Sequence, residues 1–217
     1  MSNGARTAIE AIESATVREA VAEIAAGRTI IVIDDADREN EGDFVAAGPG
    51  VTPETINLMV TKGRGLVCLA IDKEIAERLR LSPQNGSTGA LHGTNFTVSV
   101  DAVEGTTTGV SASDRAKTIQ VLSDPESKPE ELARPGHIFP IVAHPGGLIA
   151  RRGHTEAAVW LCRMAGLAPA GVICEIMSEN GDMAGRAELD AVAEELDMVL
   201  IHVDELTREA ERLEKRG

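Results

Sequence analysis

The feature that most constrains the fold of this chain is the interleaving of short apolar runs with amphipathic stretches. Short runs rich in valine, isoleucine and leucine are typical of buried strands, and apolar residues that recur about every three to five positions predict helices. Strands are expected at residues 29–33, 66–71, 96–100, 138–143, 171–177 and 198–203. Helices are expected at residues 9–24, 53–62, 73–79, 113–122, 155–165, 187–196 and 205–215. This order predicts an α/β (α+β) fold.

Composition excludes several classes of protein. The 217 residues carry 35 acidic and 21 basic side chains, a formal net charge of −14, which argues against a nucleic-acid partner. No apolar run approaches the roughly 18 residues of a membrane span, and the first residues lack a secretory pattern. The cysteines Cys68, Cys162 and Cys174 form no close pair, so we interpret them as reduced core thiols. We expect one cytoplasmic domain over residues 1–217 with no membrane partner.

The densest chemical signal is the acidic segment 34–43, which follows the apolar run 29–33. Five of its first eight residues are Asp or Glu. Carboxylates packed this closely repel one another unless a cation or solvent screens them. Ligand-binding loops commonly follow the carboxyl ends of strands, which favours a hard divalent ion. The alternative is a solvated acidic loop, and the spacing of an EF-hand is absent.

A second signal is Arg151-Arg152-Gly153-His154-Thr155-Glu156, which stands at the start of an expected helix. Guanidinium groups, exposed backbone N–H groups and the helix dipole together suit an anion such as phosphate. His154 is a candidate metal ligand, or else only part of the helix cap.

Two further residues are candidates for acid/base work. His137 lies in the segment 134–140, which proline and glycine stiffen into an expected loop, and imidazole changes protonation near neutral pH. The alternative for His137 is a hydrogen-bonded turn histidine. Glu175 lies within the apolar strand expected at residues 171–177, where ionisation costs free energy unless a donor or cation pairs with the carboxylate. The alternative for Glu175 is a water-facing position on an edge strand.

The hydroxyl-rich segment 105–115 runs into an expected helix. It lacks the Gly-Lys-Ser/Thr ending of a P-loop, so nucleotide triphosphate hydrolysis is not implied. Its hydroxyl groups could hold a sugar. Equally, Ser111 and Asp114 have the spacing of an ordinary helix capping box.

Taken together, these segments resemble the 3,4-dihydroxy-2-butanone 4-phosphate synthase family. The resemblance covers residues 8–203 and its motifs occur in the family's order, which makes it more specific than any single motif. The motifs that carry it are the acidic residues of 34–43, Thr107–Arg115, Arg134–His137, Gly153–Ala157 and Cys174–Glu175.

The resemblance implies a single-domain, mixed-sheet α/β sandwich and a homodimer whose sites lie near the subunit interface. It implies Mg²⁺, or Mn²⁺ in its place, with two ions per site and with Glu39 and His154 as metal ligands. His137 and Glu175 would be the acid/base pair. The substrate-binding set that the resemblance implies comprises Arg38, Glu39, Asp43, Thr108, Arg151, Arg152, Gly153, His154, Thr155 and Glu175.

The implied activity is a lyase reaction that converts D-ribulose 5-phosphate to L-3,4-dihydroxy-2-butanone 4-phosphate and formate in riboflavin biosynthesis. Removing a proton beside a ketone develops negative charge that a divalent ion stabilises as an enediolate; the dehydration and the carbon-skeleton rearrangement come from the family alone. The alternatives are another metal-dependent sugar-phosphate isomerase or aldolase, and a non-catalytic sugar-phosphate-binding module. Because the chain leaves no room for the GTP cyclohydrolase II domain to which this synthase is often fused, we expect a stand-alone enzyme.

Overall fold

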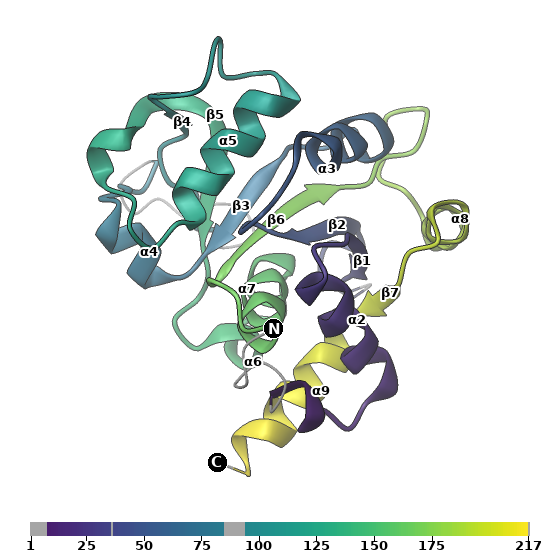
Figure 1. Cartoon of the computed structure of the whole chain (residues 1–217). Helices are drawn as coiled ribbons and strands as arrows, with labels where there is room; N and C mark the ends of the chain where they lie inside the picture. The colour runs from purple at the N-terminus through teal and green to yellow at the C-terminus, as the bar shows by residue number, and fades with distance from the viewer. Residues whose placement is uncertain (1–7, 36, 85–93, 217) are drawn as a thin grey trace.

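The computed structural model describes residues 8–35, 37–84 and 94–216. Within these residues, seven strands form one mixed sheet in the order β4-β5-β3-β6-β2-β1-β7, with helices on both faces (Figure 1). The strands are β1 (Ile30–Ile33), β2 (Gly42–Ala47), β3 (Cys68–Ile71), β4 (Val100–Ala102), β5 (Leu132–Val142), β6 (Ala170–Glu175) and β7 (Leu200–His202). The predicted mixed-sheet α/β sandwich is therefore confirmed.

The helices cover the sheet in two layers. One layer holds α2 (Ala15–Ala25), α6 (Gly147–Ala150), α7 (His154–Met164) and α9 (Val203–Glu214). The other holds α3 (Pro53–Leu58), the π-helix η1 (Met59–Gly63), α4 (Lys73–Arg78), α5 (Ala112–Ser123) and α8 (Arg186–Leu196). A 3-10 turn, η2 (Pro129–Glu131), leads into β5.

Each inner strand divides its side chains between two apolar cores. Ile30 and Val32 on β1 pack beneath α2 and α7, whereas Ile31 and Ile33 point to the opposite core, because successive strand side chains alternate between faces. Coverage of both faces explains why the strand is a continuous apolar run. The buried strand predicted at residues 29–33 is confirmed, and so is the burial of all three cysteines.

Several element predictions were wrong in extent. β2 was not expected, because its sequence Gly-Asp-Phe-Val-Ala-Ala begins with a polar pair and ends in small residues; Asp43 therefore lies in a strand and not in the acidic loop. β5 begins at Leu132, so His137 also lies in a strand.

The remaining differences concern element ends. The first long helix starts at Ala15, where Ser14 caps it, and not at residue 9. The helix expected to reach residue 62 continues past Leu58 as η1. The strand expected at 96–100 forms only isolated bridges at Phe96 and Thr97, and β4 starts at Val100. In the described part of the chain, every helix is too short or too polar for a membrane crossing.

Candidate active site

A row of polar side chains crosses the sheet at one level, on the face that α7 covers. Asp43 on β2 lies opposite Val32 on β1 and opposite Glu175 on β6. Side chains two positions apart in a strand share a face. Asp43 therefore points to the same side as Val45, and Glu175 to the same side as Ile173, and both of these apolar residues belong to the core beneath α7.

His137 lies in the same row. β5 pairs in parallel with β3 so that Phe139 lies opposite Cys68, and His137 is consequently level with Leu66. Phe139 packs against the core beneath α7, so His137, two positions earlier, points to that face. β3 separates His137 from Glu175, which amounts to two strand spacings or roughly 10 Å.

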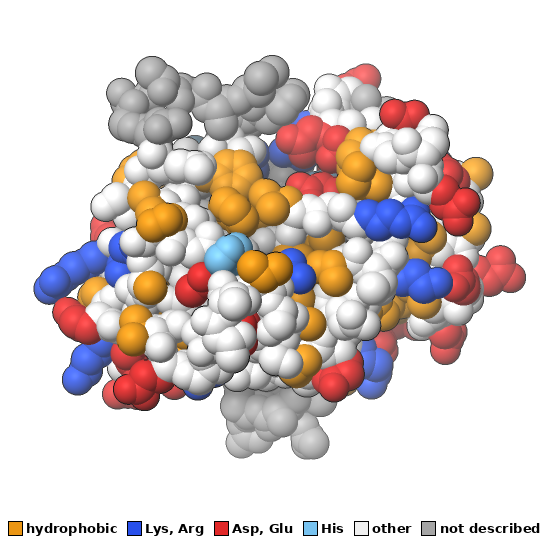
Figure 2. Space-filling view, turned by 90° about the horizontal axis from the view of Figure 1, so that it is seen from above, with side chains coloured by type: hydrophobic (Ala, Val, Ile, Leu, Met, Phe, Trp, Pro, Cys, Tyr) orange, Lys and Arg blue, Asp and Glu red, His pale blue; other side chains and the backbone are white. Residues whose placement is uncertain are grey.

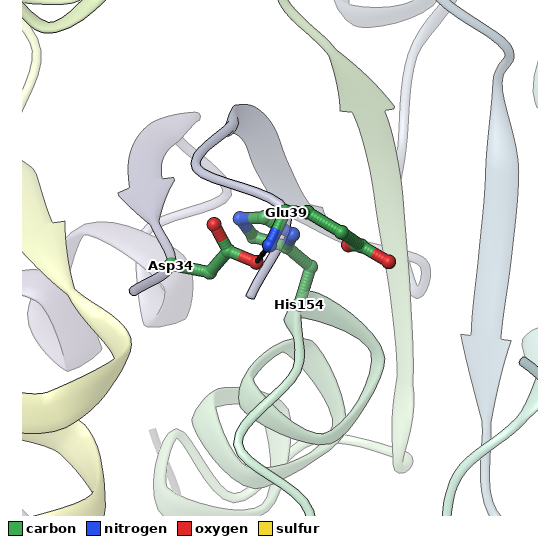
Figure 3. Close-up of side chains that lie close together, drawn as sticks. All are labelled: Asp34, Glu39 and His154. Atoms are coloured by element: carbon green, nitrogen blue, oxygen red, sulfur yellow. Dashed lines mark hydrogen bonds between the residues drawn. The ribbon is translucent and has the colours of Figure 1, made fainter. Parts of the chain in front are cut away.

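The candidate metal centre lies beside this row. Asp34 directly after β1, Glu39 in the acidic loop and His154 at the first position of α7 place one ligand atom each within 4.8 Å of one another. Figure 3 shows the three residues close together, with a dashed line for the hydrogen bond from the Glu39 N–H to Asp34. The structure thus brings together the two predicted ligands, Glu39 and His154, and adds Asp34.

The acidic loop is organised around the buried carboxylate of Asp34. The backbone N–H groups of Glu39 and Glu41 donate to its two oxygens at 3.3 Å and 2.9 Å. The Arg38 guanidinium lies between two carboxylates, 2.5 Å from Asp34 Oδ2 and 2.6 Å from Glu39 Oε2. Arg38 therefore offsets part of the negative charge that the loop concentrates.

His154 presents a lone pair to the site. Its Nε2 lies 3.1 Å from the carbonyl oxygen of Val32, and a carbonyl only accepts, so Nε2 carries the proton and Nδ1 the lone pair. Burial lowers the pKa of His154, which keeps the imidazole neutral at pH 7, the form that binds metal ions.

Asp43 completes the polar environment of that lone pair. Its Oδ1 lies 3.7 Å from His154 Nδ1, is buried, and has no hydrogen-bond partner among the described residues. Burial, followed by the nearby charge of Glu175, raises the pKa of Asp43 well above its usual range. Asp43 Oδ1 and His154 Nδ1 are both electron-rich, and they face each other inside a cluster of carboxylates. A cation placed there would reduce the repulsion, so these residues fit a bound divalent ion.

Glu175 has a backbone donor. The N–H of Leu66 donates to Glu175 Oε2 at 2.8 Å. This approach requires Gly65, because a Cβ there would lie 2.6 Å from the same oxygen. β6 lies between β2 and β3 in the sheet, so the alternative of a water-facing edge strand was wrong for Glu175.

The segment that was predicted to bind an anion lies at the start of α7. Gly153 is the N-cap and contributes no side-chain cap, so the first N–H groups of the helix are left for a ligand. Arg151 Nη1 lies 2.6 Å from Glu156 Oε2, and a Cβ on Gly153 would lie 2.5 Å from that nitrogen. Thr155 is buried in the first turn. Arg152 turns away to α9, where its Nη1 lies 3.0 Å from Asp204 Oδ1.

The hydroxyl-rich segment lies beside His137. Gly109 packs so closely that a Cβ would lie 2.5 Å from His137 Nδ1, and Thr108 is its exposed neighbour. The Ser111 hydroxyl accepts from the Asp114 N–H at 3.0 Å and caps α5, as the alternative interpretation of this segment predicted.

Two polar residues of the site were missed by sequence reasoning. Asp34 belongs to the acidic segment but was not singled out, although its place directly after an apolar strand was a usable signal. Asp101 on β4 pairs with His137 Nδ1 at 2.8 Å. The only signal for Asp101 was a charged residue within an apolar run, which does not identify a partner.

The fold and the site define a class of protein, a mixed-sheet α/β protein with a carboxylate–histidine centre beside a helix start suited to an anion. The chain belongs to the 3,4-dihydroxy-2-butanone 4-phosphate synthase family, whose sequence profile matches residues 18–209.

Named relatives agree with this family. The chain is 52% identical over 199 residues to riboflavin biosynthesis protein RibBA of Cytophaga hutchinsonii, covering 91% of this chain and 49% of the relative. It is 52% identical over 179 residues to 3,4-dihydroxy-2-butanone 4-phosphate synthase of Neisseria meningitidis serogroup B, covering 82% of this chain and 49% of the relative. The chain therefore spans about half the length of these relatives.

Solved structures share the fold. A 3,4-dihydroxy-2-butanone 4-phosphate synthase in complex with two magnesium ions superposes with a TM-score of 0.87 at 36% identity, covering 91% of this chain and 97% of that one. The two-domain synthase RibBX from A. baumannii superposes with a TM-score of 0.84 at 47% identity, covering 88% of this chain and 56% of that one.

Proposed function

We propose that the chain converts D-ribulose 5-phosphate to L-3,4-dihydroxy-2-butanone 4-phosphate and formate, a step of riboflavin biosynthesis. The observation that carries this proposal is the buried set of carboxylates and imidazole beside the start of α7. This set offers a cation centre, an anion site and acid/base groups on one face of the sheet, which are the parts that proton removal from a sugar phosphate requires. Family membership supports the same activity.

The metal ligands in this proposal are Glu39 and His154, with Asp34 within reach. Two Mg²⁺ ions, as in the solved relative, or Mn²⁺ in their place, suit the carboxylates, and the imidazole makes Mn²⁺ a realistic substitute. When bound, a divalent ion stabilises the negative charge that develops on oxygen as a proton leaves the neighbouring carbon.

The phosphate group of the substrate would bind at the start of α7. Arg151, Gly153 and Thr155 surround the free N–H groups there, and the helix dipole adds a partial positive charge. Arg152 contributes positive charge from the adjacent position while paired with α9. Arg38 and Asp43 would contact the sugar end, and Thr108 would line the site from the hydroxyl-rich segment.

His137 and Glu175 are the proposed acid/base pair. Both lie in the polar row of the sheet, and each has one hydrogen-bond partner that fixes its orientation. A side chain that removes a proton from carbon early in the reaction becomes an acid, which can then protonate a hydroxyl group that leaves as water. Two titratable side chains about 10 Å apart are able to serve opposite ends of a five-carbon substrate.

We also propose a homodimer that works in the cytoplasm on a free sugar phosphate, without nucleic acid or membrane. Leu66 and Val110 support the dimer, since both residues are about half exposed, at 45% and 52%. Leu66 is level with His137 in the sheet, and Val110 follows Gly109, which packs against His137. Figure 2 shows hydrophobic side chains gathered around a histidine on the face seen from above. A second copy of the chain would cover such apolar surface.

Purified protein incubated with ribulose 5-phosphate tests the proposed activity. Formate is expected with Mg²⁺, and chelation by EDTA is expected to abolish its release. Glu175→Gln is expected to lower kcat by at least about 100-fold, the lower range for a general acid or base. Interconversion to another pentose phosphate without formate would indicate an isomerase, and fragments other than formate would indicate an aldolase. Binding without turnover would indicate a binding module.

A further inference from the structure

The side chain of Asp101 is held against His137 by two hydrogen bonds. Asp101 Oδ2 lies 2.8 Å from His137 Nδ1, and Asp101 Oδ1 accepts the backbone N–H of the same histidine at 2.9 Å. Both oxygens of one carboxylate therefore serve a single residue on the neighbouring strand. The Asp101 side chain is 15% exposed, whereas that of His137 is 47% exposed, so the carboxylate backs the imidazole and leaves its far edge open.

The local backbone is arranged around this pair. The pairing of β4 with β5 shifts register between Val100 and Asp101, and a bulge of this kind re-aims a side chain. Gly136 lets the strands approach, since a Cβ there would lie 2.0 Å from the carbonyl carbon of Val100. Gly109 closes over the pair from the hydroxyl-rich segment, where a Cβ would lie 2.2 Å from Asp101 Oδ2.

The segment that covers the pair is itself anchored. The buried carboxylate of Asp114 accepts the Thr107 hydroxyl at 2.8 Å and the Gly109 N–H at 2.9 Å. Gly109 adopts a φ of +87°, a conformation that glycine adopts without strain. The position of Asp101 against His137 therefore depends on β4, β5 and the start of α5 together.

This geometry selects one form of the imidazole. A carboxylate only accepts hydrogen bonds, so Nδ1 must carry the proton and Nε2 the lone pair. Carboxylates orient catalytic histidines in this way in other enzymes.

We propose that Asp101 is a positioning residue that fixes the Nδ1–H tautomer of His137 and thereby makes Nε2 available as a base. This proposal rests on the proposed function, because it deepens the role given there to His137. Asp101 acts only through the imidazole and does not touch the substrate.

Asp101→Asn tests the proposal with little change in shape. The Asp101 carboxylate uses two acceptor oxygens, whereas an asparagine side chain has only one. If that oxygen accepts the backbone N–H of His137, the asparagine NH₂ group faces Nδ1 and favours the tautomer in which Nε2 carries the proton. The corresponding change in a serine protease lowers kcat by about 10⁴. We expect kcat for formate release to fall by at least about 100-fold with KM changed by less than about threefold.

Asp72→Asn is the matched control. Asp72 is also buried, and it accepts the Ile75 N–H at 3.0 Å and pairs with Arg163 at 2.9 Å, but it has no contact with His137. The kcat of the Asp72→Asn variant is expected to equal that of the wild type. Circular dichroism and thermal unfolding establish that each variant is folded, and Asp101→Glu, which keeps both acceptor oxygens, is expected to recover part of kcat.

Nitrogen-15 NMR of the imidazole groups provides a readout that does not require turnover. His137→Gln identifies the signals of His137 among the five histidines. A protonated Nδ1 in the wild type and a protonated Nε2 in Asp101→Asn are expected. A protonated Nε2 in the wild type, or an unchanged kcat in a folded Asp101→Asn variant, would overturn the proposal. If the wild type releases no formate, the proposed function fails while the tautomer measurement still decides the role of Asp101.

Discussion

At the scale of single residues, what the site can bind depends on which atoms of each side chain already form hydrogen bonds within the protein. His154 uses Nε2 on the Val32 carbonyl and keeps Nδ1 for a ligand. Asp34 is both a candidate ligand and the acceptor that holds the acidic loop through backbone N–H groups. Asp43 keeps one buried oxygen without a partner. Such an oxygen costs free energy unless a ligand satisfies it, so we attribute its placement in the site to ligand binding.

Removing one proposed ligand charge should weaken metal binding. Glu39→Gln is expected to lower the affinity for Mn²⁺ by at least about tenfold, since loss of even an outer-sphere partner costs about 10–100-fold. Isothermal titration with Mn²⁺ measures this change without any turnover. Asp37→Asn is the control, because Asp37 is an exposed acid of the same loop and its substitution also removes one negative charge. Equal affinities for the two variants would contradict the metal assignment.

The two adjacent arginines should differ in their effect on substrate binding. Arg151 lies against Gly153 and Glu156 at the start of α7, whereas Arg152 pairs with Asp204 on α9. A hydrogen bond to a charged group contributes about 1.5–3 kcal/mol, so Arg151→Gln is expected to raise KM for ribulose 5-phosphate by about 10–100-fold. Arg152→Gln should raise KM less. Steady-state kinetics compares the two, and a larger effect for Arg152→Gln would reverse the assignment.

At the scale of elements, the short strand β4 and the start of α5 form one unit around His137. Asp114 connects them, because it accepts hydrogen bonds from Thr107 and Gly109 while its own N–H is capped by Ser111. Ser111 is therefore confirmed as the N-cap of α5, while the binding of a sugar by the hydroxyl groups stays a prediction. Because Asp114 lies in the first turn of α5, its two bonds hold the preceding loop against the helix start.

The Asp114 contacts should make part of the stability depend on pH. The hydroxyl of Thr107 lowers the pKa of Asp114 below its ordinary value of 3.8. A lowered pKa in the folded state means that the contribution is fully present above the unfolded pKa and is lost as the pH falls through the folded one. Asp114→Asn is therefore expected to have a lower Tm than the wild type at pH 7, with a gap that narrows below about pH 4.

Thermal unfolding followed by circular dichroism between pH 7 and pH 3 measures that gap. Glu104→Gln is the control, since Glu104 is an exposed acid directly before the same segment, and the Tm of this variant should follow that of the wild type throughout. A gap that stays constant on acidification would show that the Asp114 charge contributes nothing.

At the scale of the whole molecule, one sheet gathers groups that lie far apart in the chain. His154 and Val32 are 122 positions apart and Leu66 and Glu175 are 109 positions apart, yet both pairs are hydrogen-bonded. The same arrangement leaves Leu66 and Val110 exposed beside His137. An apolar rim next to acid/base groups is surface that a second copy of the chain would bury.

A charge on that rim should break the proposed dimer. Burying one valine contributes about 1.5–3 kcal/mol, and twofold symmetry counts each contact twice, so Val110→Asp is expected to raise the dimer Kd by at least about 100-fold. Light scattering coupled to size exclusion measures the mass. Ile149→Asp, at an exposed position on α6 away from β4 and β5, should remain a dimer. A wild-type protein that is monomeric in solution would contradict the proposed dimer.

The sequence by itself determined the fold class, most helices, the inner strands other than β2 and the segments that hold the candidate site residues, because burial periodicity and helix caps are local properties of the chain. Only the tertiary structure decided that Asp34 joins Glu39 and His154, that Asp101 backs His137 and that Arg152 turns to α9. Those partnerships depend on strand order and register, and a local pattern does not specify which strands become neighbours.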